Sequence, residues 1–280
     1  MRLVLLGTGV PSLSLRRHGA SQAVIVDGEA LVIDCGHGST LQMMRAGIDP
    51  LHVRHVFLTH HHYDHTVDLA HFVLSTWITG RDFPLKVYGP TGTEMMAEAL
   101  FDRAFSIDIR ARTSRGTQRR RGIQVKAQDI DEGEVASAGA WRVSAVRVDH
   151  LAEGTFSVGY RVESGGKAIV VSGDTRPCRG LVELGRGADI LVHEVFFSPE
   201  LEESGVPAGR RPGSVSPDFA QKVRHTKPEE VGAIAREAGV KRLVLSHLWS
   251  DRDLDQLRAL VKKQFDGEVV VGEDLMAFDC

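Results

Sequence analysis

The sequence has few cysteines, few aromatic residues and no long apolar run. Its 280 residues include only Cys35, Cys178 and Cys280, which are too few and too widely spread for a disulfide framework. We therefore expect a reducing, cytoplasmic location. No stretch approaches the roughly 18 apolar residues that a membrane-spanning helix needs, and the first residues lack the apolar core of a secretion signal. The formal net charge of −3 gives no overall field that would attract nucleic acid.

Short β-type runs alternate with helical patterns along the chain. The Asp27-Gly28 pair between two of these runs predicts a tight hairpin. Thr226, three residues before Glu229, predicts the N-cap of a helix, and residues 204–217, rich in Gly and Pro, predict a surface loop. Because no repeat interrupts the alternation, we expect one domain over residues 1–280. The predicted strands are 3–6, 23–27, 30–34, 55–58, 85–88, 141–148, 156–162, 168–172, 190–195, 242–245 and 269–271, and the predicted helices are 39–46, 68–78, 92–105, 228–238 and 253–263.

The strongest chemical signal follows the predicted strand at 55–58, where residues 60–65 read HHHYDH. Alternate residues of an extended chain face the same side, so His60 and His62 can converge on one point, while Asp64 and His65 address a second point nearby. Imidazole and carboxylate ligands suit Zn²⁺, and spare coordination positions are typical of catalytic sites. The motif therefore predicts a catalytic metal site, against the alternative of a chance histidine cluster on a solvated loop.

Three further candidate ligands lie at the ends of other predicted strands: His150, Asp174 and His247. Taken singly, each is more typical of a capping or turn residue than of a metal ligand. Together with the histidine motif they favour one shared site.

The order His60-x-His62-x-Asp64-His65, followed by these three residues, resembles the metallo-β-lactamase superfamily of metallohydrolases. Within that superfamily the chain most resembles the ribonuclease Z and arylsulfatase-like branch. This narrower likeness rests on Gly7-Thr8-Gly9, Ile33-Asp34-Cys35-Gly36, Gly159-Tyr160-Arg161 and the segments 172–177 and 191–194.

The resemblance implies an α/β (α+β) fold, a four-layer αββα sandwich with a metal pair at one edge of its two sheets. It implies two Zn²⁺ per chain, with Mn²⁺ or Fe²⁺ as alternatives, and a hydroxide shared by the two metals as the nucleophile. Carried over residue by residue, it assigns His60, His62 and His150 to one metal, Asp64, His65 and His247 to the other, and Asp174 to a bridge between them. Asp64 thereby belongs to the catalytic machinery.

A proton donor for the leaving group is also implied by this branch. Glu194 and His225 match its acid relay, although Val195-Phe196 and Thr226-Lys227 replace the residues that usually follow. The alternatives are a buried Glu194 that orients a ligand and a His225 that faces solvent at the start of a helix.

We expect a hydrolase that acts on a small phosphodiester, sulfate ester or related organic ester. A lactonase, a ribonuclease Z-like endonuclease that processes the 3′ end of tRNA, and a non-catalytic RNA-binding scaffold are the alternatives. Only 23 residues separate His150 from Asp174, which leaves no room for the long arm with which ribonuclease Z grips tRNA and argues against tRNA processing. The expected partner is a small-molecule ester, without a membrane, and a homodimer is compatible with the resemblance.

Two other features bear on partners. Trp249, two residues after His247, is the predicted wall of a substrate pocket. An arginine-rich stretch lacks interleaved aromatic residues, so we expect a surface loop or an oligomer contact there rather than a nucleic-acid interface. Its arginines are Arg110, Arg112, Arg115, Arg119, Arg120 and Arg121.

Overall fold

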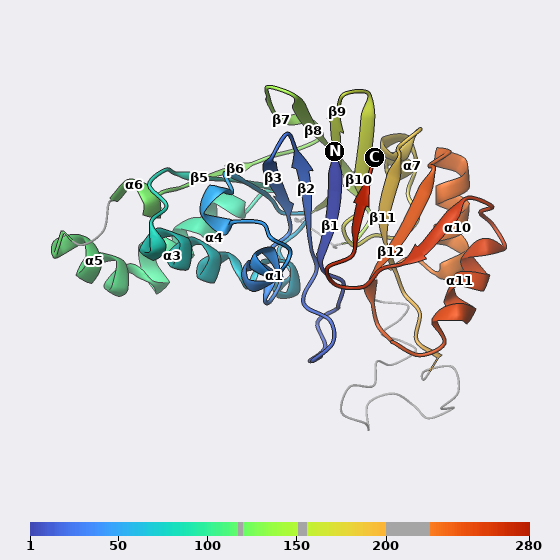
Figure 1. Cartoon of the computed structure of the whole chain (residues 1–280), viewed down its shortest axis with the longest axis horizontal. Coiled ribbons are helices and arrows are strands. Elements are labelled where there is room, and N and C mark those ends of the chain that lie inside the picture. Colours follow the sequence, from blue (N-terminus) through green and yellow to red (C-terminus); the bar gives the residue numbers. More distant parts are fainter. Residues whose placement is uncertain (117–119, 151–155, 200–224) are drawn as a thin grey trace.

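The computed structural model describes residues 1–116, 120–150, 156–199 and 225–280. Two seven-stranded sheets face each other in the middle of the molecule, and helices cover the outer face of each sheet (Figure 1). The predicted loop at 204–217 and Arg119 lie outside the described residues. Among the residues described, no helix is long and apolar enough to cross a membrane.

The first sheet has the strand order β14-β1-β2-β3-β4-β5-β6. The predicted turn between β2 and β3 is confirmed, since Asp27 and Gly28 have φ values of 49° and 83° and the strands pair antiparallel. From β3 to β6 the strands run parallel. The strands are β1 (Arg2–Gly7), β2 (Ser21–Val26), β3 (Glu29–Ile33), β4 (His55–Phe57), β5 (Leu85–Gly89), β6 (Val125–Asp129) and β14 (Ala277–Asp279).

Helices cover this sheet and continue beyond its β6 edge toward one end of the molecule (Figure 1). They are α1 (Ser39–Arg45), the 3-10 helix η1 (Pro50–His52), α2 (Tyr63–Thr66), α3 (Leu69–Thr79), α4 (Thr93–Glu98), the π-helix η2 (Ala99–Ala104), α5 (Ser106–Ser114) and α6 (Arg120–Ile123).

The second sheet has the order β13-β12-β11-β10-β9-β8-β7, with β10 to β13 parallel. Because parallel strands end at the same edge, the loops that follow β10, β11 and β12 lie together. The elements of this half are β7 (Gly133–Ala138), β8 (Trp141–Val148), β9 (Ser157–Ser164), β10 (Lys167–Val171), β11 (Ile190–Val195), β12 (Arg242–Leu248), β13 (Glu268–Val271), α7 (Arg179–Gly185), α10 (Pro228–Ala238) and α11 (Leu254–Lys262).

Three apolar layers hold the sandwich together. Side chains of both sheets, such as Leu5 and Val192, fill the space between the sheets. Phe72 packs in the layer beneath the helices of the first sheet, and Val231 packs in the layer beneath those of the second. This arrangement of helices, two sheets and helices is the predicted αββα fold.

Some elements escaped prediction for physical reasons. Strand β6 is an edge strand whose inward-facing side chains are only half-buried, and α5 has no buried residue, so neither shows a clear apolar period. The expectation of an arginine-rich loop is wrong for four of the arginines. Arg110 and Arg112 lie in α5, and Arg120 and Arg121 lie in α6.

Candidate metal centre

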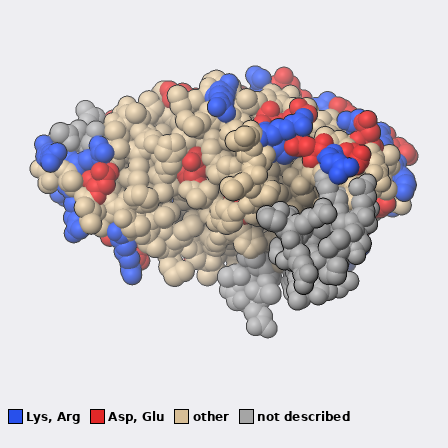
Figure 2. Space-filling model, turned by 90° about the horizontal axis from the view of Figure 1, so that it is seen from below, with Lys and Arg blue, Asp and Glu red and all other residues tan. Residues whose placement is uncertain are grey.

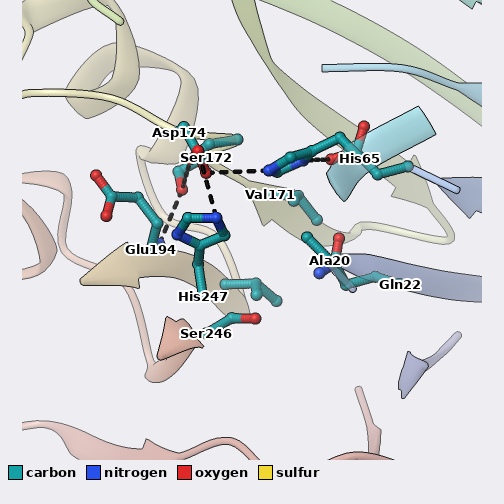
Figure 3. Close-up of a pocket in the computed structure, with 12 residues that line it drawn as sticks. Ala20, Gln22, His65, Val171, Ser172, Asp174, Glu194, Ser246 and His247 are labelled. Atoms are coloured by element: carbon teal, nitrogen blue, oxygen red, sulfur yellow. Dashed lines mark hydrogen bonds and ion pairs between the residues drawn. The ribbon is translucent and has the colours of Figure 1, made fainter. Parts of the chain in front are cut away.

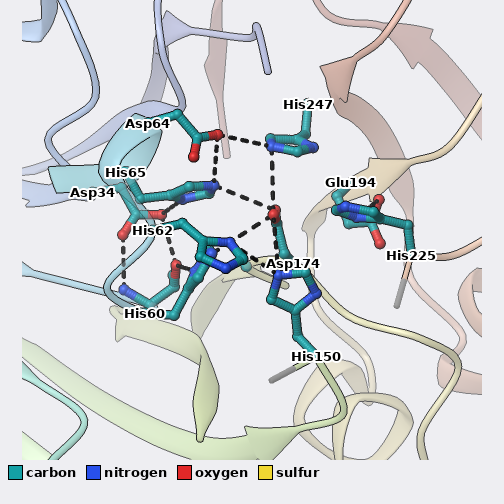
Figure 4. Close-up of polar contacts among 12 residues, drawn as sticks. Asp34, His60, His62, Asp64, His65, His150, Asp174, Glu194, His225 and His247 are labelled. Atoms are coloured by element: carbon teal, nitrogen blue, oxygen red, sulfur yellow. Dashed lines mark hydrogen bonds and ion pairs between the residues drawn. The ribbon is translucent and has the colours of Figure 1, made fainter. Parts of the chain in front are cut away.

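The histidines and carboxylates of the sequence motifs meet at one edge of the sandwich (Figure 4). Residues 60–65 follow β4 of the first sheet. From the second sheet, His150 follows β8, Asp174 follows β10, and His247 lies near the end of β12. Both sheets must therefore be in place before the cluster exists.

The predicted ligands form two groups in which the candidate ligand atoms lie within 4.8 Å of one another. His60, His62, His150 and Asp174 make one group, and Asp64, His65 and His247 make the other. A third group within the same distance, Asp174, His225 and His247, shares members with both.

The Asp174 carboxylate lies between the two groups. Its Oδ2 is 3.7 Å from Nε2 of both His60 and His150. The same carboxylate is 3.5 Å from Nε2 of His65 and 3.4 Å from Nε2 of His247. Asp174 therefore faces members of both groups at once.

The chemistry of these atoms fits a divalent metal ion. Nε2 of His60, Nε2 of His65, Oδ1 of Asp64 and Oδ1 of Asp174 are buried and have no hydrogen-bond partner among the residues that the structure describes. Buried polar atoms are normally paired, so such a set of donor atoms directed at common points requires an explanation. Neutral imidazoles and carboxylates are the ligands of catalytic zinc, and a metal would satisfy these atoms together. The predicted ability to bind metal is thus a property of the cluster.

The charges of the metal-free cluster are mutually dependent. Burial lowers the pKa of His60 well below its usual range, and the neighbouring His65 lowers it further. Burial also opposes the charged form of His65, but Asp174 and Asp34 outweigh it and raise the pKa of His65 well above its usual value. Burial would raise the pKa of Asp174, yet His247 and His65 hold that pKa far below its usual range. A metal ion held by His65 would have to displace the proton on its ring, so its affinity would fall with falling pH.

Asp34 orients part of the cluster, and the sequence reasoning assigned it no role. Its Oδ2 lies 2.8 Å from Nδ1 of His65 and accepts a hydrogen bond from the Thr59 hydroxyl, while its Oδ1 accepts from the Thr59 backbone N–H. A carboxylate on Nδ1 fixes the histidine ring with Nε2 directed at the cluster. Asp34 has a φ of 60°, in the left-handed region that non-glycine residues seldom adopt. The acid at the end of a buried strand, within the segment 33–36, was the available signal.

A β-bulge directs His247 into the site. The pairing of β11 with β12 shifts between Glu194 and Val195, so His247 is an extra residue on β12. Its φ is 55°. Bulges of this kind change the direction of a side chain and occur next to functional sites.

Glu194 and His225 form a buried pair beside the cluster. Oε2 of Glu194 lies 3.2 Å from Nδ1 of His225, and Oε1 accepts a hydrogen bond from the Thr226 N–H at 2.9 Å. Burial alone would lower the pKa of His225, but Glu194 raises it to about 9. The ring centre of His225 is 5.0 Å from that of His150 and 5.3 Å from that of His247. The alternative of a solvent-facing His225 is therefore wrong.

Thr226 does not cap the following helix, contrary to the prediction. The N-cap of α10 is Lys227, whose N–H donates to Glu230. The Thr226 hydroxyl donates instead to the carbonyl of Thr175, at 2.6 Å. This bond ties the segment that carries His225 to the loop after β10, which carries Asp174.

Two aromatic side chains flank His225. Trp249, the predicted pocket wall, meets the His225 ring edge-on with ring centres 5.7 Å apart, and Phe196 lies nearly parallel to it at 6.3 Å. Phe196 and Trp249 also contact each other. Both are half-buried, so they border the site without closing it.

A small cavity lies behind the cluster, between the sheets (Figure 3). Its volume is about 20 Å³, which is room for a single water molecule and not for a substrate. Two of the side chains that line it, Gln22 and Ser246, have a buried oxygen atom without a hydrogen-bond partner. The cavity is therefore no substrate site, and among the candidate ligands of the first group His62 is the exposed one.

Comparison with known proteins defines the class. A family model described as a β-lactamase superfamily domain matches residues 29–248. The chain is 31% identical to the ribonuclease Z of Mycolicibacterium gilvum over 286 aligned residues, which cover 98% of this chain and 94% of that protein. The chain belongs to the β-lactamase superfamily and, within it, to the ribonuclease Z family. The predicted class, a hydrolase of the metallo-β-lactamase fold, is thereby confirmed.

Two solved structures share the fold. YhfI from Bacillus subtilis, titled a metallo-β-lactamase fold protein, superposes with a TM-score of 0.76 at 19% identity, covering 99% of this chain and 98% of that one. The short form of human tRNase Z gives a TM-score of 0.74 at 22% identity, covering 100% and 99%. At these identities the likeness establishes the fold alone.

Proposed function

We propose that the chain is a metal-dependent phosphodiesterase that cleaves RNA at the 3′ side of tRNA precursors, as the name ribonuclease Z indicates for its relatives. The observation that carries this proposal is the Glu194–His225 pair placed against the histidine and carboxylate cluster. Hydrolysis of RNA expels an alkoxide, a poor leaving group that needs a proton, whereas lactones and aryl esters depend on such a donor far less.

In this proposal the two groups of the cluster hold two metal ions, zinc in the first instance. His60, His62 and His150 would hold one, Asp64, His65 and His247 the other, and Asp174 would bridge them. Bound there, such metals make water a nucleophile near neutral pH and stabilise negative charge on phosphoryl oxygens.

The chain's own residues do the remaining work. Asp34 holds the His65 ring in the orientation that a ligand needs. The Glu194 carboxylate lies 3.2 Å from Nδ1 of His225 and stabilises the charged form of the ring, so that Nε2 can deliver a proton to the leaving oxygen. The Thr226 hydroxyl bond to Thr175 fixes the distance between this donor and the Asp174 loop.

The expectation of a small ester substrate finds no support among the relatives, whose shared name points to RNA. The short spacing between His150 and Asp174 no longer argues against that substrate. The alignment with the Mycolicibacterium protein spans 286 positions and uses 98% of this chain, so it has little room for an inserted arm. At least one relative named ribonuclease Z therefore has about the same length as this chain.

The test compares four substrates of the zinc-loaded protein. They are a tRNA precursor with a 3′ trailer, bis-p-nitrophenyl phosphate, p-nitrophenyl sulfate and a simple lactone. We expect the precursor to be cleaved with the highest kcat/KM. Asp174→Ala should abolish this cleavage, and Asp131→Ala, at an exposed aspartate outside the cluster, should not. Turnover of the sulfate or the lactone without cleavage of RNA would refute the proposal.

A further inference from the structure

The helices α5 and α6 form a projection that the candidate metal centre does not use. The projection consists of residues 106–116 and 120–123, and we call it the arginine projection. It lies at one end of the long axis, beyond the β6 edge of the first sheet (Figure 1). Helix α5 has no buried residue, and its main neighbour is the π-helix η2. Burial of apolar surface therefore does not explain its composition.

The projection is strongly basic in an acidic protein. Residues 106–116 and 120–123 contain five arginines and one aspartate, a net charge of +4, so the rest of the chain carries −7. The view from below shows mostly basic side chains with a few acidic ones at this end, a broad surface with hardly any charge beside it, and mixed charges at the other end (Figure 2). The positive charge is thus concentrated away from the rest of the chain.

Most of these arginines are available to a partner. Arg112 pairs with Asp108 at 2.9 Å, and Arg110 donates to the carbonyl of Ser106 within the same helix. Arg115, Arg120 and Arg121 are exposed and form no ion pair with any residue in the described ranges. Their guanidinium groups can each present two parallel N–H donors to a phosphate.

We infer that the arginine projection binds the phosphate backbone of a double-helical RNA stem, outside the site of cleavage. The inference rests on the proposed function for its substrate class. The arginine projection contains no aromatic residue, so it lacks the aromatic rings on which the bases of a single strand typically stack. Proteins recognise RNA double helices through shape and phosphates, which needs cations without aromatic partners. The lack of aromatic residues, which in the sequence argued against a nucleic-acid interface, therefore favours a double-stranded ligand over a single-stranded one.

The position of the projection fits this role. The metal centre lies between the two sheets at one edge, and the projection lies at the end of the molecule. A stem whose 3′ strand enters the metal centre would have to extend toward that end of the molecule to reach the projection. The projection would then increase the affinity for the RNA stem and orient it, while hydrolysis takes place at the cluster.

The experiment measures the affinity of an RNA hairpin with a 12-base-pair stem and a 3′ tail. The full-length protein carries Asp174→Ala so that the RNA stays intact. The test variant adds Arg115→Gln, Arg120→Gln and Arg121→Gln. The matched control adds Arg179→Gln, Arg258→Gln and Lys263→Gln, which remove the same charge from α7 and the α11 region. Kd is measured from 50 to 500 mM KCl, and thermal unfolding verifies that each variant is folded.

We expect the test variant to bind about tenfold or more weakly at 50 mM KCl and to lose about 2 from the slope of log Kd against log salt. The control variant should keep the slope. Equal affinity and slope in the test and control variants would overturn the inference. So would tighter binding of polyglutamate than of the hairpin, which would assign the projection to an acidic protein.

The two proposals fail separately. If the otherwise wild-type protein does not cleave a tRNA precursor but the test variant still loses affinity for the hairpin, the proposed function fails and the projection remains an RNA surface. If the precursor is cleaved with an unchanged KM by the triple variant, the inference fails alone. Turnover of bis-p-nitrophenyl phosphate by the triple variant should equal that of wild type.

Discussion

The metal centre and the arginine projection are built in opposite ways. The centre gathers mostly buried side chains from loops of both sheets, and partners such as Asp34 and Thr59 fix their orientation. The projection presents exposed side chains on two short helices, α5, whose main neighbour is η2, and α6, which packs on α3. Chemistry here depends on the whole fold, whereas the charge of the projection depends on local sequence. Mutations should therefore separate turnover from RNA affinity.

Metal removal should produce the largest effect. Dialysis against a chelator at neutral pH is expected to abolish hydrolysis of every substrate, because no residue of the cluster replaces the metal's effect on water. Readdition of zinc should restore it. The assay is kcat with bis-p-nitrophenyl phosphate before and after. Full activity in protein shown to be metal-free would contradict the claim that turnover depends on a metal centre.

His225→Ala should have the next largest effect, and a selective one. Loss of a general acid typically costs about 10²- to 10⁴-fold for a poor leaving group. We expect this loss with RNA and much less with p-nitrophenyl esters. Metal content must be measured in parallel, since His225 also lies with Asp174 and His247 in a group that could hold an ion. Equal loss on all substrates together with lost metal would make His225 a ligand.

Asp34→Asn should lower metal affinity by about 10- to 100-fold, because the His65 ring loses its charged partner on Nδ1. The measurement is competition with a zinc chelator of known affinity. At saturating zinc, kcat should return close to the wild-type value. The variant Asp68→Asn offers a comparison, since Asp68 is a buried carboxylate that accepts hydrogen bonds from Thr40 and lies outside the cluster. The same zinc affinity in Asp34→Asn and Asp68→Asn would contradict the orienting role.

Asp189 should show the smallest effect, on stability alone. Burial alone would raise its pKa, but Lys241, the Ala168 N–H and Lys167 lower it to about 2. A folded-state pKa below the unfolded value of about 3.8 stabilises the protein above pH 4, and this contribution is lost as pH falls toward 2. Asp189→Asn should therefore lower the unfolding temperature by about 2 °C at pH 7 and by less at pH 2.5. Scanning calorimetry at pH 7 and pH 2.5 measures this difference. A larger decrease of the unfolding temperature at pH 2.5 than at pH 7 would contradict the prediction.

The contiguous half of the site was predictable from the sequence. His60 and His62 alternate on an extended chain and Asp64 and His65 follow at the turn, so residue spacing alone placed them near one point. His150, Asp174 and His247 carried weak signals singly, because a polar residue at a strand end is common. Only their order as a set, and its resemblance to a superfamily, related them to the motif.

The parts that escaped prediction depend on contacts across the fold. Asp34 acts because the end of β3 lies beside His65, and no local pattern encodes that contact. The orientation of His247 depends on a bulge between β11 and β12. Helix α5 has no buried residue, so the hydrophobic period that indicates other helices is missing there.

The most direct test of the central claim is the zinc content of purified full-length protein, by elemental analysis, for wild type and Asp174→Ala. The arrangement of the cluster predicts roughly two zinc ions per wild-type chain and at most one in the variant, because the carboxylate that faces both groups is gone. Wild-type protein that takes up no divalent metal from a zinc-supplemented buffer would contradict the claim that these side chains form a metal centre.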